Sequence, residues 1–120
     1  MPFDLDIAWS LDGERLIGRL TPGPQHKGPE GHLHGGIAAL CLDECMAALG
    51  HALDKIHTIT GKLELRYRRP VPLDGRELRV ESWRDGDARR ATRVRGHLLD
   101  GDGLLAVEAK GLFVRVSRDA

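Results

Sequence analysis

The sequence predicts an α+β domain in which a curved antiparallel sheet of about five strands wraps around one long central helix. First, residues 34–53 are apolar or helix-favouring on nearly every face, the pattern of a helix surrounded by protein. Second, the chain after this segment alternates between apolar and polar residues and is interrupted by tight-turn sequences, as in antiparallel strands. A length of 120 residues suits one compact domain, residues 1–120, and is too short for two.

The composition limits the classes of function. Lys plus Arg and Asp plus Glu both number 18, so the formal net charge is zero, whereas a nucleic-acid-binding module normally carries a basic excess. We find no run of about 18 apolar residues and therefore expect no membrane span. The N-terminus lacks the basic start and apolar core of a signal peptide, so the expected compartment is the cytoplasm.

Before the helix, the chain is expected to form one strand and one long loop. Residues 11–14, Leu-Asp-Gly-Glu, predict a turn, and a short strand follows through about Leu20. Residues 21–31 are rich in proline and glycine, so we expect no regular structure there. A loop of this length in a small domain is often functional.

Four strands are expected after the helix, joined as an antiparallel meander. Residues 63–68 alternate between apolar and charged side chains, and prolines at 70 and 72 end the strand. Asp-Gly sequences mark the later turns. The expected boundaries are a turn at 74–75, a strand ending near Trp83, a turn at 85–87, a strand at 91–99, a hairpin turn at 100–103 and a last strand at 104–116.

Neither a disulfide nor a metal site is expected. Cys41 and Cys45 lie four residues apart in the apolar segment, where a disulfide would join near neighbours, and two ligands are too few for structural zinc. We expect both to be buried thiols. His32 and His34 have a spacing seen in metal sites, but no third ligand is evident.

Asp43 is the candidate catalytic residue. A carboxylate inside an apolar helix costs several kcal/mol unless it is paired, hydrated or protonated. The neighbours on its helical face are mostly small and leave room for a ligand or for a second helix. The alternative is that a backbone group or a histidine satisfies Asp43. Glu44 lies about 100° around the helix and is the weaker candidate. The face-sharing residues are Gly36, Ala39, Leu40, Ala47 and Gly50.

His34-Gly35-Gly36 marks the place where loop becomes helix. Backbone N–H groups in the first turn have no intrahelical partner, and the helix dipole adds positive potential there. Two glycines let a carbonyl oxygen approach this backbone closely, which suits an oxyanion hole. The alternative is that the glycines serve only helix initiation or tight packing.

The spacing of Gly35 and Asp43 has a consequence for the assembly. Eight residues of helix separate them by about 12 Å, whereas reacting groups must lie within about 3 Å of one carbonyl. Both residues can act on the same carbonyl only if two copies of the helix run antiparallel across a two-fold axis. Catalysis by this pair therefore requires a dimer.

Two segments carry a family resemblance. Residues 28–36, Gly-Pro-Glu-Gly-His-Leu-His-Gly-Gly, with Asp43 nine residues after His34, resemble the hotdog-fold thioesterases of the PaaI-like group. Residues 60–72 resemble that group's second signature, a strand ending in Tyr-x-Arg-Pro. The resemblance covers about residues 28–117. It implies a hotdog fold, hydrolysis of an acyl thioester of coenzyme A or carrier-protein pantetheine, no cofactor, no metal, and a homodimer or a dimer of dimers.

The resemblance also implies roles for the catalytic residues. A carboxylate at the Asp43 position acts as general base or nucleophile toward the thioester, and the Gly35 N–H polarises its carbonyl. A hydroxyl matched by Thr60 helps to place the water. Apart from the resemblance, we expect His34 to order the loop and the helix start, with an acid/base role as the alternative. Many members have Asn or Gln where this chain has Gly28, and Gln25 and His26 are the candidate replacements.

Substrate binding is assigned to Gly36 and to Arg66, Arg68 and Arg69. Guanidinium groups suit the phosphates of coenzyme A, although their alternation with apolar residues also describes a solvated sheet face. Two other functions stay open. One is a non-catalytic hotdog protein that binds acyl-CoA, and the other is a hotdog enoyl-thioester hydratase or dehydratase, which usually relies on a catalytic histidine in a different arrangement.

Overall fold

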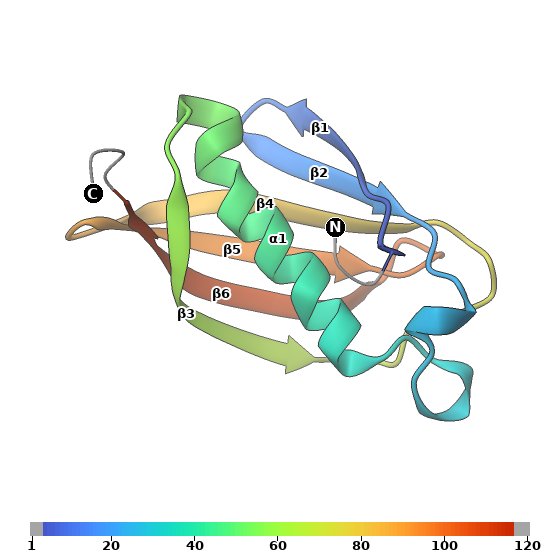
Figure 1. Ribbon diagram of the computed structural model, residues 1–120. Coiled ribbons are helices and arrows are strands. Elements are labelled where there is room, and N and C mark those ends of the chain that lie inside the picture. The colour runs from blue at the N-terminus through green and yellow to red at the C-terminus, as the bar shows by residue number, and fades with distance from the viewer. Residues whose placement is uncertain (1–3, 117–120) are drawn as a thin grey trace.

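The computed structural model describes residues 4–116. They form one curved antiparallel sheet of six strands, and a long helix, α1 (Gly35–Asp54), lies across one face of it (Figure 1). The predicted α+β class is confirmed, with six strands rather than about five. The strands are β1 (Ala8–Asp12), β2 (Arg15–Leu20), β3 (Thr58–Tyr67), β4 (Leu78–Ala88), β5 (Ala91–Leu99) and β6 (Leu105–Arg115).

The strand order is β1-β2-β4-β5-β6-β3, so the predicted meander of all four later strands is wrong. Only β4, β5 and β6 form a meander, whereas β3 pairs with β6 at one edge of the sheet. The reason lies in residues 68–77, which contain Pro70 and Pro72 and therefore do not form a hairpin. This segment crosses the end of the sheet, and the Leu73 N–H donates to the Gly31 carbonyl.

An N-terminal strand that the sequence did not indicate accounts for the sixth strand. The predicted turn at 11–14 connects β1 to β2, and Gly13 has a φ of 62° there. Every residue of β1 is exposed, so the strand lacks the buried apolar positions from which strands are predicted. It is held by pairing with β2 and by Trp9, whose ring lies where a side chain at Gly18 would be.

The predicted turn at 85–87 is also wrong, because β4 continues to Ala88. Gly86, with a φ of 100°, lies in an irregularity of the β4–β5 pairing, so its freedom serves a bulge rather than a turn. The chain reverses at Arg89-Arg90 instead. The predicted strand at 91–99 and the hairpin turn at 100–103 are confirmed.

The loop before α1 is more regular than expected. It contains two short 3-10 helices, η2 (Pro24–His26) and η3 (Pro29–Gly31). The His34 N–H donates to the His26 carbonyl at 2.9 Å, and the Gly28 N–H donates to the His32 carbonyl at 2.6 Å. These bonds fold the loop back against the first residue of α1.

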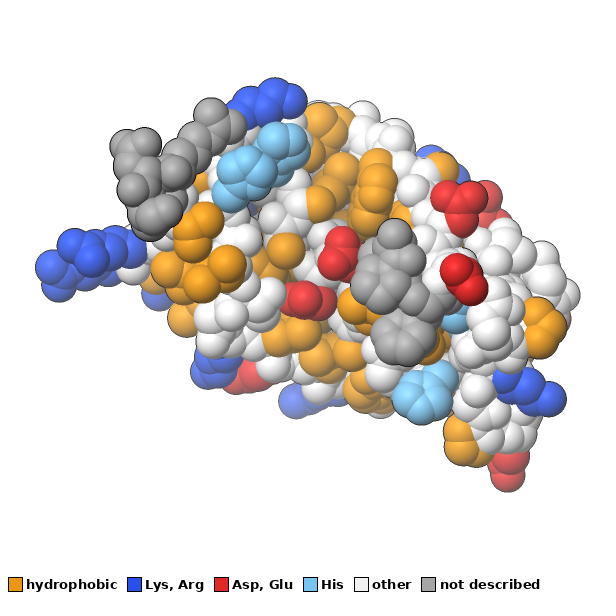
Figure 2. Space-filling model, viewed as in Figure 1, with side chains coloured by type: hydrophobic (Ala, Val, Ile, Leu, Met, Phe, Trp, Pro, Cys, Tyr) orange, Lys and Arg blue, Asp and Glu red, His pale blue; other side chains and the backbone are white. Residues whose placement is uncertain are grey.

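The two faces of α1 have different surroundings. One face packs on the sheet and is almost fully buried, whereas the opposite face, which includes Ala39, Leu40, Asp43 and Ala47, is only half-buried. Figure 2 shows hydrophobic side chains along the line of the helix with acidic side chains between them. The expectation of a helix wrapped on most sides is therefore met only in part by one chain. The buried side chains are those of Ile37, Ala38, Cys41, Leu42, Cys45, Met46 and Leu49.

By length and composition alone, the 20-residue helix α1 is long and apolar enough to cross a membrane. The sequence has no unbroken run of about 18 apolar residues, since Asp43 and Glu44 interrupt the helix, and the expectation of no membrane span stays a prediction. A helix that forms the core of a folded domain has the same composition, and α1 packs against β2, β3, β4, β5 and β6.

Both cysteines are buried free thiols, as expected. Burial raises the pKa of Cys41 and of Cys45 to about 12. The Cys45 thiol also contacts the Ser82 hydroxyl, at 3.3 Å. Because the thiolate is the nucleophilic form, neither residue is a nucleophile at neutral pH.

Gly96 tests the close packing of α1 on the sheet. A Cβ at this position would lie 2.9 Å from Met46 Sδ and 3.1 Å from Leu42 Cδ2. We expect Gly96→Val to lower the free energy of unfolding by about 1–3 kcal/mol through overpacking, as measured by denaturant titration. The control Arg95→Val changes the exposed neighbour on the same strand and should have a much smaller effect. Equal effects of the two variants would contradict this packing.

Candidate active site

Asp43 lies half-buried in the middle of α1, and its partner is a hydroxyl on β3. Thr60 Oγ1 donates a hydrogen bond of 2.6 Å to Asp43 Oδ1. The partner is therefore neither a histidine nor a backbone group, the two alternatives considered from the sequence. Within residues 4–116, Asp43 Oδ2 receives no hydrogen bond, so this oxygen is available to a water molecule or a substrate.

A β-bulge brings Thr60 to Asp43. The β3–β6 pairing shifts register between Thr60 and Lys62, which leaves Gly61 as the extra residue. In a regular strand, residues three apart point to opposite faces. Here Thr60 and Leu63 both point toward α1. A Cβ on Gly61 would lie 2.9 Å from Val114 Cγ2, so the bulge position favours glycine.

His34 caps the first turn of α1. Its Nδ1 accepts a hydrogen bond of 2.9 Å from the Gly36 N–H. Its carbonyl accepts from the Ile37 and Ala38 N–H groups at 3.0 and 3.1 Å. Among the described residues, the Gly35 N–H alone of this turn has no acceptor. A free amide at a helix N-terminus is a site for an anionic oxygen.

Tyr67, at the end of β3, contacts the same turn and was given no role from the sequence. Its hydroxyl donates a hydrogen bond of 2.6 Å to the Gly35 carbonyl. Burial raises the pKa of Tyr67, so the phenol is protonated at neutral pH and able to donate. Its place in the Tyr-x-Arg-Pro signature was the only sequence signal that could have pointed to it.

Within one chain, these groups form two separate clusters. Thr60 and Asp43 meet near the middle of α1, whereas Tyr67, His34 and Gly35 meet at its N-terminus. The helix is continuous from residue 35 to residue 54, so Gly35 and Asp43 are about 12 Å apart along its axis. Within one chain, Gly35 and Asp43 therefore do not contact the carbonyl of the same substrate molecule.

Arg66 at the end of β3 and Arg68 just after it do not share the side of the sheet on which Asp43 lies. Arg66 and Arg68 alternate with Leu65 and Tyr67 and point to the face opposite α1. Arg68 is paired with Glu108 at 2.7 Å, and its hydrogen bond holds the pKa of Glu108 below its usual value. Arg68 and Arg69 both lie beyond Tyr67, the last residue of the strand, and both are exposed.

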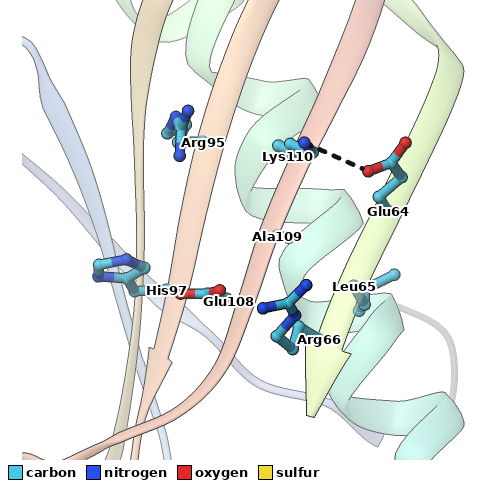
Figure 3. A pocket seen from close by; sticks show the side chains of 8 residues that line it. All are labelled: Glu64, Leu65, Arg66, Arg95, His97, Glu108, Ala109 and Lys110. Atoms are coloured by element: carbon cyan, nitrogen blue, oxygen red, sulfur yellow. Dashed lines mark ion pairs between the residues drawn. The ribbon is translucent and has the colours of Figure 1, made fainter. Parts of the chain in front are cut away.

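Arg66 lines a pocket of about 310 Å³ on this outer face, where α1 lies behind the sheet (Figure 3). Opposite charges pair within the pocket, as in Lys110 with Glu64 at 3.5 Å. Burial lowers the pKa of His97, and its ring meets Trp83 edge-on. Such pairing is typical of a solvated sheet face. The lining residues are Glu64, Leu65, Arg66, Arg95, His97, Glu108, Ala109 and Lys110.

The loop explains why position 28 carries glycine. A Cβ on Gly28 would lie 3.0 Å from the His34 Cα, a tight contact that the backbone at the helix cap would have to relieve by a small shift. Of the two candidate replacements, His26 is buried, and its Nδ1 accepts from the Gly23 N–H at 3.0 Å. Gln25 is exposed.

None of the candidate residues forms a metal centre in the part of the chain that the structure describes. Within residues 4–116, no three His, Cys, Asp or Glu side chains are grouped as metal ligands. His34 already uses Nδ1 to cap the helix, which leaves one ring nitrogen for any other contact.

Among curated proteins, the chain is 29% identical over 117 residues to the acyl-coenzyme A thioesterase THEM4 of Xenopus laevis. The match covers 95% of this chain and 51% of that protein, so the chain spans about half the length of the curated relative it matches. No protein-family model matches the chain.

Several solved structures share the fold of this chain at low sequence identity. The thioesterase superfamily protein RHA08564 is 32% identical with a TM-score of 0.75, and the match covers 84% of this chain and 49% of that one. BH2602 of Bacillus halodurans, solved with CoA, is 24% identical with a TM-score of 0.81, over 96% and 76% of the two chains.

The PaaI protein of Escherichia coli is 15% identical to the chain, with a TM-score of 0.82. The match covers 96% of this chain and 81% of that one. At this identity, the likeness concerns the fold alone. Together with the six-stranded sheet around one helix, these matches confirm the resemblance predicted from the sequence: the chain has the hotdog fold of the thioesterase superfamily.

Proposed function

We propose that the chain is an acyl-thioester hydrolase that releases an acyl group from coenzyme A or from carrier-protein pantetheine. The observation that carries the proposal is the hydrogen bond from Thr60 to Asp43, which holds a carboxylate in a helix whose fold is shared with thioesterases. The match to an acyl-coenzyme A thioesterase and the fold shared with a CoA-bound protein support this substrate class.

Asp43 can act in either of two ways. As a general base, Oδ2 takes a proton from the water that attacks the thioester carbonyl, and the thiol leaves when the tetrahedral intermediate collapses. As a nucleophile, Oδ2 attacks the carbonyl itself, the C–S bond breaks, and the thiolate leaves and takes a proton from water. The acyl-enzyme anhydride that remains is then hydrolysed by water to the free acid and the Asp43 carboxylate. Thr60 has the same role in both, because it holds Oδ1 and thereby fixes the direction of Oδ2.

The Gly35 amide is the proposed oxyanion donor. Its N–H is free and lies at the positive end of the α1 dipole. Gly35 and Gly36 are both exposed, so no side chain stands between this backbone and a carbonyl oxygen. One such donor stabilises the transition state by about 3 kcal/mol in other enzymes.

We further propose that the complete site forms between two copies of the chain. Antiparallel packing of two α1 helices about Ala39 places Asp43 of one copy beside Gly35 of the other. Two features of a single copy support this packing. The outward face of α1 carries half-buried Ala39, Leu40 and Ala47, and β3 presents a ten-residue edge strand at the border of the sheet, which is prone to pair with another strand.

The proposed two-chain site indicates at which end the phosphates of coenzyme A would bind. Tyr67 ties the end of β3 to Gly35, so Arg69 of the second copy lies on the same side of the shared site as its Gly35. We therefore propose Arg69 as the nearest of the three arginines to the phosphates of coenzyme A. Arg66 and Arg68 point to the outer face, so a phosphate would reach them only around the end of the strand.

Asp43→Asn should lower thioester hydrolysis by about 100-fold or more, because the variant keeps the shape of the side chain but loses its basicity. The measurement is release of free thiol from a panel of acyl-CoAs, followed with a chromogenic thiol reagent. Glu44→Gln, at the adjacent acid, is the matched control and should stay close to the parent. Near-parental turnover by Asp43→Asn would contradict the assignment. Tight acyl-CoA binding without thiol release by the parent would favour a binding protein.

Gly35→Pro should leave the fold intact and lower kcat by about 100- to 1,000-fold, because it removes the donor proton. Gly35 is the first helical residue, a position that favours proline. His34, with φ of −61° and ψ of 133°, has the backbone conformation that a following proline requires.

Gly35→Ala is the matched control, since it keeps the N–H. Its Cβ would lie 3.7 Å from the Tyr67 ring, an ordinary contact, so we expect a much smaller loss of kcat. Circular dichroism and thermal melting would establish that both variants fold. A folded Gly35→Pro protein with parental kcat would rule out this amide as the oxyanion donor.

A further inference from the structure

The peptide group between Gly35 and Gly36 is held at both of its polar atoms. Tyr67 Oη donates to its carbonyl oxygen at 2.6 Å, and its N–H donates to His34 Nδ1 at 2.9 Å. Tyr67 comes from the end of β3, whereas His34 is the residue that precedes the helix. Two separate parts of the chain therefore fix the orientation of one peptide plane.

Such fixing matters because the two residues are glycines. Consecutive glycines have the greatest backbone freedom, and the first turn of a helix is where helices fray. The neighbouring peptide, between His34 and Gly35, carries the free N–H and shares the Gly35 Cα with the fixed peptide. With the Gly35–Gly36 plane held, the direction of the Gly35 N–H is restricted as well.

We propose that Tyr67 is a positioning residue for the reaction, which aims the Gly35 amide at the thioester oxygen through its hydrogen bond to the Gly35 carbonyl. This inference rests on the proposed function. Tyr67 does not touch the reacting atoms in this arrangement, and its ring packs beside the Gly35 Cα, where a Cβ would lie 3.7 Å away.

The position of Tyr67 on β3 links it to the other half of the site. Thr60 and Tyr67 are seven residues apart, so a regular strand would point them to opposite faces. The bulge at Gly61 turns both toward α1. One strand thus holds the carboxylate near its start and the oxyanion donor at its end.

The test begins with Tyr67→Phe, which keeps the ring and deletes only the hydroxyl. Loss of one hydrogen bond that aims a transition-state donor should lower kcat by about 10-fold. KM should change by less than about 2-fold, because a donor used only in the transition state contributes little to substrate binding. A structural role of Tyr67 alone would predict parental kcat in the folded variant.

A double-mutant cycle separates positioning from general damage. In the Gly35→Pro background no donor proton is left to aim, so Tyr67→Phe should cause no further fall in kcat. The control Thr58→Val removes another β3 hydroxyl, which contacts the Ala47 carbonyl away from this turn, and should lower kcat equally in both backgrounds if it lowers it at all. A full additional loss on adding Tyr67→Phe to Gly35→Pro would overturn the proposal.

Amide hydrogen exchange tests the hydrogen-bond arrangement independently of activity. Tyr67→Phe should weaken the protection of the Gly36 amide by about 10-fold, because one of the two bonds that hold its peptide is gone. Unchanged exchange would overturn the positioning role even if the parent hydrolyses thioesters. Suppose instead that Tyr67→Phe weakens the protection of the Gly36 amide but the parent hydrolyses no thioester. That result would overturn the proposed function and leave the hydrogen-bond arrangement established.

Discussion

The extra residue at Gly61 is the constraint on which the arrangement of the site depends. A strand turns alternate residues to alternate faces, yet β3 must point Thr60, Leu63 and Tyr67 toward the same helix. The bulge resolves this conflict, because residues before it change face relative to residues after it. As a result, one edge strand packs the partly buried Leu63 and Leu65 against the core and also hydrogen-bonds α1 at its middle and at its N-terminus.

The two faces of α1 have different roles: one stabilises the domain and the other carries the candidate catalytic carboxylate. Its buried face stabilises the domain through residues such as Leu42 and Leu49, which have no exposed surface. Its other face carries a carboxylate that Thr60 satisfies at one oxygen only, between apolar residues that one chain leaves half-covered. The same exposed apolar surface that favours a second copy would, under our proposal, bring the missing catalytic group to Asp43.

Much of the fold could be predicted from local pattern. The expected helix at 34–53 is α1, Gly35–Asp54, and the strand at 91–99 is β5, because burial imposes a clear periodicity on both. β1 was missed because none of its residues is buried. The Gly61 bulge and the contact of Tyr67 with Gly35 depend on pairing between segments that are distant in the sequence, so no local sequence pattern predicts them. Asp43 stood out because a charge in an apolar helix requires a partner. The resemblance pointed to Thr60 only as a hydroxyl that helps to place water, and its hydrogen bond to Asp43 is seen only in the structure.

The shared site is tested most directly by mixing two inactive variants. Asp43→Asn subunits keep the amide donor, and Gly35→Pro subunits keep the carboxylate, so a mixed dimer would contain one intact site. Our account predicts that refolding the two together restores roughly a quarter of the parental thiol release, since half of the dimers are mixed and each has one of its two sites intact. If differently tagged subunits form mixed dimers and the activity stays at the level of either variant alone, the two-chain site is contradicted.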